Sequence, residues 1–165
     1  MKKMRNDNKG FTLVEMIVVL VILAILAAIL VPALLGYIDE AKNSQLELHG
    51  KSVYTAAQGV ASKMYAKGAE FQNSSEASYT DFTNQVKTIS EFDTFGTAGK
   101  TEVKIVFNTD TYSKTDHNYY TVKEVYYTED GTNWVALKDG SWDTVTAAVA
   151  GAAGGIDIKR AASGS

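Results

Sequence analysis

The chain of 165 residues contains no cysteine, one proline and only two histidines. The absence of cysteine excludes disulfide bonds, thiol catalysis and thiolate metal sites. His49 and His117 lie in different regions, without a third ligand type at a metal-binding spacing, so both are expected at the surface. No phosphate-binding glycine loop and no nucleophile elbow occur. We therefore expect no metal site, no cofactor and no enzymatic activity.

The chain has a net positive charge only at its amino terminus. The first ten residues carry four basic side chains against Asp7, a local charge of +3, so the total of −3 leaves −6 for the remainder. A body this acidic is not expected to bind nucleic acid, because phosphates need cationic partners.

One long apolar run follows the basic residues. From Phe11 to Ile38 the only charged side chain is Glu15, and residues 16–31 are apolar without a break. About 20 apolar residues span the hydrocarbon core of a bilayer, so this run is long enough. The preceding basic residues place the amino terminus in the cytoplasm and the rest of the chain outside.

Two interpretations of the run leave Glu15 unexplained. An ordinary secretory signal would be cut near residues 24–27, but the apolar run continues beyond that point. A plain transmembrane anchor does not need an acid, and a charge at a helix centre costs roughly 2.5–3.5 kcal/mol on insertion scales. A carboxylate in a membrane segment is best treated as functional, with a partner to be named.

A third interpretation gives Glu15 a partner. If the chain is cut between Gly10 and Phe11, Phe11 becomes the amino terminus and carries an ammonium. Glu15 then lies about one helical turn from that group, and a neighbouring copy shifted along its axis could set its own ammonium against the carboxylate. In a setting of low dielectric constant, each charge favours ionisation of the other.

The stretch "KGFTLVE" with its apolar helix resembles the class III signal and first helix of type IV pilins and pseudopilins. The resemblance covers about residues 1–50. It implies cleavage after Gly10 by a prepilin peptidase, methylation of Phe11 and a role of Glu15 in assembly. Pro32, which lacks an N–H and clashes with the carbonyl of Ala28, matches the helix-weakening proline of the family.

The resemblance implies a structural subunit of a type IV pilus, a helical extracellular filament for adhesion, twitching motility or surface contact. The expected partners are further copies of the chain, minor pilins, a prepilin peptidase, an assembly ATPase, a membrane platform protein and, before assembly, the membrane itself. The alternatives are a pseudopilin of a type II secretion or competence system and, in another class, a single-pass membrane-anchored binding module. By family analogy the absence of cysteine favours a Gram-positive host.

The second half of the helix is expected to be amphipathic and to end near Gly68. Its apolar positions recur at spacings of 7, 4, 3 and 4, which places them on one helical face: Leu46, Val53, Ala57, Val60 and Met64. Gly50 and Gly59 are expected to cost about 1 kcal/mol each relative to alanine and to allow bending.

The sequence after this helix predicts a small antiparallel sheet of three or four strands, preceded by an irregular connector over residues 69–100. That connector has room for a short helix in which Phe82, Val86 and Ile89 share one face. Val103, Ile105 and Phe107 alternate as in a half-buried strand, and an Asp-Gly pair at 130–131 predicts a hairpin.

The tail adds a candidate edge strand at Ile156 and Ile158. The aromatic residues of the strands are assigned to packing rather than to a carbohydrate platform or a conductive array.

The predicted fold is therefore α+β, a pilin-like lollipop. Its predicted parts are a leader at 1–10, a transmembrane and assembly half of the helix at 11–37, an amphipathic half at 38–68 and a globular head at 69–165.

Overall fold

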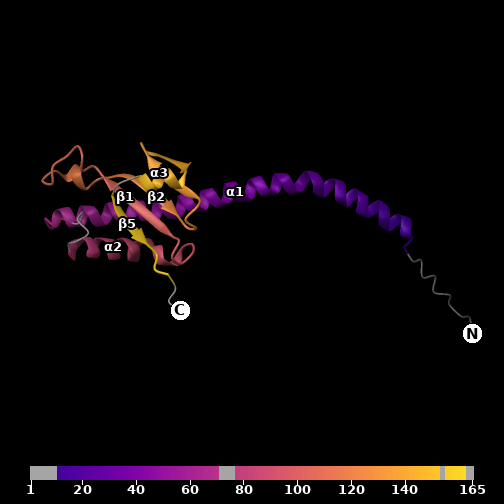
Figure 1. The fold of residues 1–165 in the computed structure, drawn as a ribbon, viewed down its shortest axis with the longest axis horizontal. Coiled ribbons are helices and arrows are strands. Elements are labelled where there is room, and N and C mark those ends of the chain that lie inside the picture. Colours follow the sequence, from indigo (N-terminus) through magenta and orange to yellow (C-terminus); the bar gives the residue numbers. More distant parts are fainter. Residues whose placement is uncertain (1–10, 71–76, 153–154, 163–165) are drawn as a thin grey trace, which may run out of the picture. The chain divides into compact units, whose positions relative to one another are not determined.

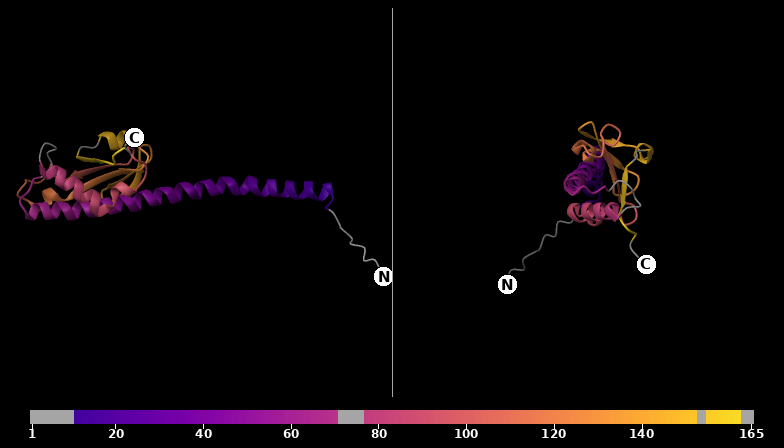
Figure 2. Two further views of the ribbon diagram at one scale, coloured as in Figure 1. Left: turned by 90° about the horizontal axis from the view of Figure 1, so that it is seen from below. Right: turned by 90° about the vertical axis from the view of Figure 1, so that its left-hand side faces the viewer.

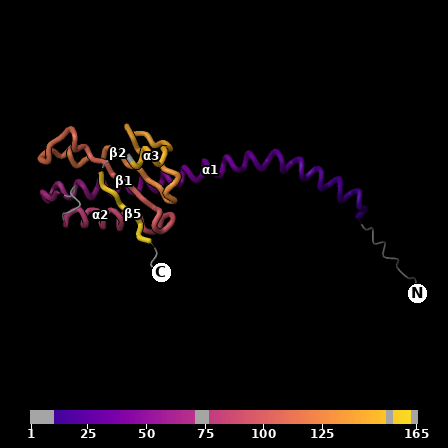
Figure 3. Tube along the Cα trace, in the orientation of Figure 1, coloured from indigo at the N-terminus to yellow at the C-terminus, as the bar shows by residue number. Residues whose placement is uncertain are grey.

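The computed structural model describes residues 11–70, 77–152 and 155–162. Contacts divide the chain into two compact units, Met1–Ala41 and Lys42–Ser165, so helix α1 (Leu13–Ala66) contributes to both. Figure 1 labels helices and strands on the ribbon, and Figure 3 follows the same chain as a tube.

The described part of the first unit is a helix that buries none of its apolar side chains. Large apolar residues from Phe11 to Ile38 are exposed, Phe11 to 78%. Among the described residues, α1 is long and apolar enough to cross a membrane. Helix α1 continues through Pro32.

The second unit is an α+β fold with a five-stranded antiparallel sheet. The strands are β1 (Glu102–Phe107), β2 (Val122–Thr128), β3 (Trp134–Lys138), β4 (Ser141–Val145) and β5 (Ile156–Lys159). Their order in the sheet is β4-β3-β2-β1-β5. The described sheet thus exceeds the predicted three or four strands because the candidate edge segment pairs with β1 as β5, Val103 opposite Ile158.

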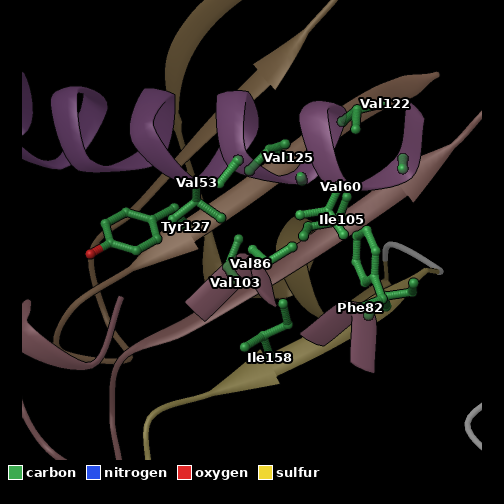
Figure 4. Packing of buried hydrophobic residues seen from close by; sticks show 14 of the residues in the cluster. Val53, Val60, Phe82, Val86, Val103, Ile105, Val122, Val125, Tyr127 and Ile158 are labelled. Atoms are coloured by element: carbon green, nitrogen blue, oxygen red, sulfur yellow. The ribbon is translucent and has the colours of Figure 1, made fainter. Parts of the chain in front are cut away.

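The main core lies between one face of the sheet and two helices, the second half of α1 and α2 (Ala77–Ser90). Figure 2 shows these two helices side by side. The predicted apolar face of α1 is buried, and in Figure 4 Val53 and Val60 point toward Ile105 and Val125 of the strands. Packing of the amphipathic helix against the sheet is therefore confirmed.

The end of α1 is fixed by its glycine, as the sequence predicted. Gly68 adopts φ +66°, the left-handed conformation that glycine enters without a steric penalty. The N–H of Ala69 donates to the carbonyl of Met64 at 3.0 Å, and that of Gly68 donates to Tyr65 at 2.9 Å. This pair of bonds is a Schellman motif, which satisfies carbonyls that the helix end leaves open.

Helix α2 confirms the predicted short helix but buries a different face. Phe82 and Val86 are buried as expected, whereas Ile89 is 60% exposed and Ser90 takes the inward position. A serine tolerates this burial because its hydroxyl donates to the carbonyl of Val86 at 2.7 Å. Spacing groups Ile89 with Phe82 and Val86, but the core buries only the latter two together with Ser90.

The predicted hairpin is present between β2 and β3. Asp130 accepts hydrogen bonds from the N–H groups of Thr132 and Asn133, both at 2.8 Å. Partial burial acts to raise the pKa of Asp130, but these bonds and the side-chain bonds of Asn133 and Thr128 outweigh it and lower that pKa. The turn is therefore held by an ionised carboxylate.

A smaller cluster covers the opposite face of the sheet. There Ala150 of helix α3 (Ala147–Ala152) packs against Tyr126, Trp134 and Ala136. Tyr127 of β2 and Tyr120, just before that strand, are buried in the main core, so packing accounts for these aromatic residues, as predicted.

Candidate functional site

The amino-terminal end of α1 carries a capping box built from Thr12 and Glu15. The N–H of Thr12 donates to Glu15 Oε2 at 2.8 Å, and the Thr12 hydroxyl donates to the same oxygen at 2.7 Å. In return, the N–H of Glu15 donates to Thr12 Oγ1 at 3.2 Å. The first backbone bond of the helix follows, from the N–H of Met16 to the Thr12 carbonyl.

This arrangement satisfies backbone donors that the first turn of a helix leaves without partners. It also holds an acid beside the positive end of the helix dipole, where negative charge is stabilising. All its atoms belong to Thr12 and Glu15, so it does not require residues 1–10. Thr12 was not identified from the sequence, although Thr-x-x-Glu before an apolar run is the known signature of a capping box.

The capping box uses only one oxygen of the carboxylate. Glu15 Oε2 accepts both bonds from Thr12, whereas Oε1 accepts no hydrogen bond from any residue that the structure describes. An ionised carboxylate has about four acceptor positions, so Glu15 can hold its own helix end and still receive a donor from another molecule.

The other residues singled out from the sequence are dispersed. Gly10 lies outside the described residues. Phe11 is exposed two positions before the helix begins, and Pro32 lies inside the helix more than four turns further on. The capping box therefore joins Glu15 to Thr12, and not to another of the predicted site residues.

A polar network in the second unit involves His49, which was expected at the surface. His49 Nδ1 lies 2.5 Å from Glu129 Oε1, and the hydroxyl of Tyr127 donates to that same oxygen at 3.1 Å. The imidazole stacks on the Phe95 ring with centroids 3.9 Å apart, and its side chain is 18% exposed. The surface prediction was thus wrong for His49, while His117 is exposed.

Across the described residues, no three histidine, aspartate or glutamate side chains form a group able to hold a metal. His49 instead links helix α1 to the end of strand β2, with Glu129 as the shared partner. Burial and the neighbouring Glu129 charge raise the pKa of Tyr127, which keeps its hydroxyl protonated as a donor.

Comparison with known proteins shows which proteins this chain resembles. Residues 5–31 match the family model described as the prokaryotic N-terminal methylation motif. The type IV major pilin protein PilA of Myxococcus xanthus is 32% identical over 79 residues, which cover 48% of this chain and 30% of that pilin. No solved structure matches the chain.

A long helix that packs through its second half on an antiparallel sheet is a pilin-like α+β arrangement. The chain matches the N-terminal methylation motif and is similar to a type IV major pilin over about half of its length. The expectation drawn from "KGFTLVE" is thereby confirmed at the level of the family.

Proposed function

We propose that this chain is the structural subunit of a type IV pilus. In this proposal a prepilin peptidase cuts after Gly10, Phe11 is methylated, and the mature chain polymerises into an extracellular filament. An assembly ATPase, a membrane platform protein and minor pilins act with it, and the precursor resides in the cytoplasmic membrane with its amino terminus inside.

The observation that carries the proposal is the open oxygen of Glu15 at the start of a helix whose large apolar side chains are exposed as far as Ile38. Those side chains need either lipid or other copies of the helix around them. Because lipid tails are about as apolar as leucine, transfer from membrane to filament gains little hydrophobic free energy. Packing and polar pairing must therefore direct assembly.

The ammonium of a neighbouring Phe11 is the partner proposed for Glu15. Two unit charges about 4 Å apart attract by roughly 4 kcal/mol at an effective dielectric constant of 20. That attraction is comparable with the roughly 2.5–3.5 kcal/mol that an unpaired charge costs within a membrane helix. Pairing thus offsets the cost of the acid in the assembled state.

A pseudopilin of a secretion or competence system would use the same contact. The curated relative is described as a major pilin, which favours the pilus. Filaments on the surface of wild-type cells distinguish the two, since a pseudopilin acts as a short piston.

The test compares Glu15→Gln with Glu15→Ala in cells that make the full chain. Glutamine keeps an oxygen that accepts the bonds from Thr12, as capping boxes allow, but it removes the charge. We expect both variants to insert into the membrane and keep a protease-resistant head, and both to lose surface filaments.

Thr12→Ser is the matched control, because serine retains the capping hydroxyl next to an unchanged charge. We expect it to assemble as the wild type does. Normal filament yield from Glu15→Gln would show that the charge is not required, and would contradict the proposed pairing.

A further inference from the structure

The unit Lys42–Ser165 leaves few large apolar side chains exposed. Among the described residues of this unit they are Leu48, Ile89, Tyr112 and Val149. Leu48 and Ile89 come from the two helices on one face of the sheet, and Val149 comes from α3 on the opposite face. A contiguous apolar surface rimmed by polar residues often marks a contact site, and of these four residues Leu48 and Ile89 line one groove together.

Leu48 and Ile89 line one groove of about 420 Å³ between helices α1 and α2. The groove exists because α2 turns Ser90 into the core and leaves Ile89 60% exposed beside Leu48, which is 65% exposed. Ala56 and Gly59 form part of its lining. Gly59 has no heavy atom within 4 Å of the position that a Cβ would take, so the surface above it is open.

Val149 forms a projection of similar chemistry on the other side of the sheet. Helix α3 is composed of alanine and glycine apart from this residue, and Ala150 fixes it by packing against Tyr126 and Trp134. Val149 is 43% exposed as a result. It is the one large apolar side chain of α3.

The charges beside the two surfaces are opposite. Lys51 lines the groove, and its side chain is 52% exposed, so the pair that it forms with Glu47 at 3.5 Å is weak. Asp143 of β4 lies opposite Ala136, which packs against the same cluster as α3. No ion pair of Asp143 occurs within the described part of the chain.

We propose that the groove between α1 and α2 receives helix α3 of a second copy, with Val149 seated between Leu48 and Ile89 and Asp143 near Lys51. Groove and projection lie on opposite faces of one sheet, so each copy offers both halves of the contact. Such a heterologous contact repeats without closing unless its rotation forms a ring, and therefore generates an open helical polymer. This proposal rests on the proposed filament and adds a second contact to the one at Glu15.

The absence of cysteine permits a direct test in assembled filaments. We would introduce Ile89→Cys and Val149→Cys together in the full chain and oxidise intact filaments. A disulfide requires Cα atoms within about 7 Å of each other, and the two positions are on opposite faces of the sheet within one copy. The expected result is a ladder of covalent multimers and a loss of the monomer band on a denaturing gel.

Tyr112→Cys combined with Val149→Cys is the control, since Tyr112 is exposed in the β1–β2 loop away from the groove. We expect this pair to remain monomeric. If the double variant at the groove assembles poorly, filaments that mix the two single-cysteine variants provide the second test and should yield dimers only.

The outcomes separate this inference from the proposed function. Filaments that form but give no ladder and no mixed dimers overturn the groove contact and leave the pilus proposal intact. Absence of filaments from the wild-type chain overturns both proposals. Loss of filaments on substitution of Ile89 or Val149, but not of Tyr112, supports the contact.

Discussion

The two glycines of the amphipathic half of α1 allow one substitution to be tested in two environments. A Cβ added to Gly50 would lie 2.7 Å from two atoms of the Trp142 ring, and 3.6 Å from Tyr127 Cβ. A Cβ added to Gly59 would meet nothing within 4 Å. Both positions are interior to the helix, so alanine gains about 1 kcal/mol of helix propensity at each.

The structure therefore predicts effects of opposite sign. Gly59→Ala should stabilise the unit by about 1 kcal/mol. At Gly50 the rigid indole must move, and overpacking of this kind costs about 1–3 kcal/mol, which equals or exceeds the gain. We expect Gly50→Ala to be up to about 2 kcal/mol less stable than the wild type.

Urea denaturation of the full chain in detergent micelles, followed by tryptophan fluorescence, measures both changes. A Gly50→Ala/Trp142→Ala double variant completes the cycle, because removal of the ring should make alanine at position 50 favourable. If Gly50→Ala were as stabilising as Gly59→Ala, the packing of Trp142 against the helix would be refuted.

Two further predictions concern the second unit. Burial and the hydrogen bond to Glu124 raise the pKa of Tyr126 from 10.0 to about 12. The neutral hydroxyl of Tyr126 therefore contributes its full share of the folding free energy below pH 10, and this contribution is lost as pH rises through 12. Melting temperatures at pH 9 and 11 should fall less for Tyr126→Phe than for the wild type, and equal losses would contradict this assignment. Arg160 donates from Nη1 to the carbonyls of Phe95 at 2.7 Å and Gly96 at 2.9 Å. Arg160→Ala should cost about 1–2 kcal/mol and expose this loop to limited proteolysis, whereas unchanged protection would show that the bonds do not hold it.

Much of the second unit follows from local patterns in the sequence. Alternation along β1 identifies the residues that face the core, and the Asp-Gly pair identifies the hairpin, because strand periodicity and turn conformation depend on neighbouring residues. Gly68 marks the end of α1 for the same reason, since a left-handed residue is needed there.

The wrong predictions concern residues whose environment depends on contacts between segments far apart in the sequence. Hydrophobic spacing groups Ile89 with Phe82 and Val86, but the core buries Ser90 in its place, and the Ser90 hydroxyl donates to the carbonyl of Val86. His49 looked like a surface residue because its partner Glu129 is 80 positions away. Gly50 appeared to be a point of bending, whereas the Trp142 ring occupies the space beside it.

Of the two residues in the capping box, only Glu15 was predicted from the sequence. Glu15 was conspicuous because an acid in an apolar run needs an explanation, and the family motif marked its position. Thr12 was not predicted, although its N–H and hydroxyl are the local partners of that carboxylate. A capping role and a pairing role are compatible, because the two use different oxygens of the same carboxylate.

The mass of the chain in filaments sheared from the cell surface tests the central claim most directly. Processing after Gly10 predicts the mass of residues 11–165 plus one methyl group, with the methyl located on the amino-terminal fragment that begins at Phe11. A mass that includes residues 1–10, or a chain that begins near Ala28, would mean that no ammonium forms on Phe11 to pair with Glu15. Either result would contradict the account.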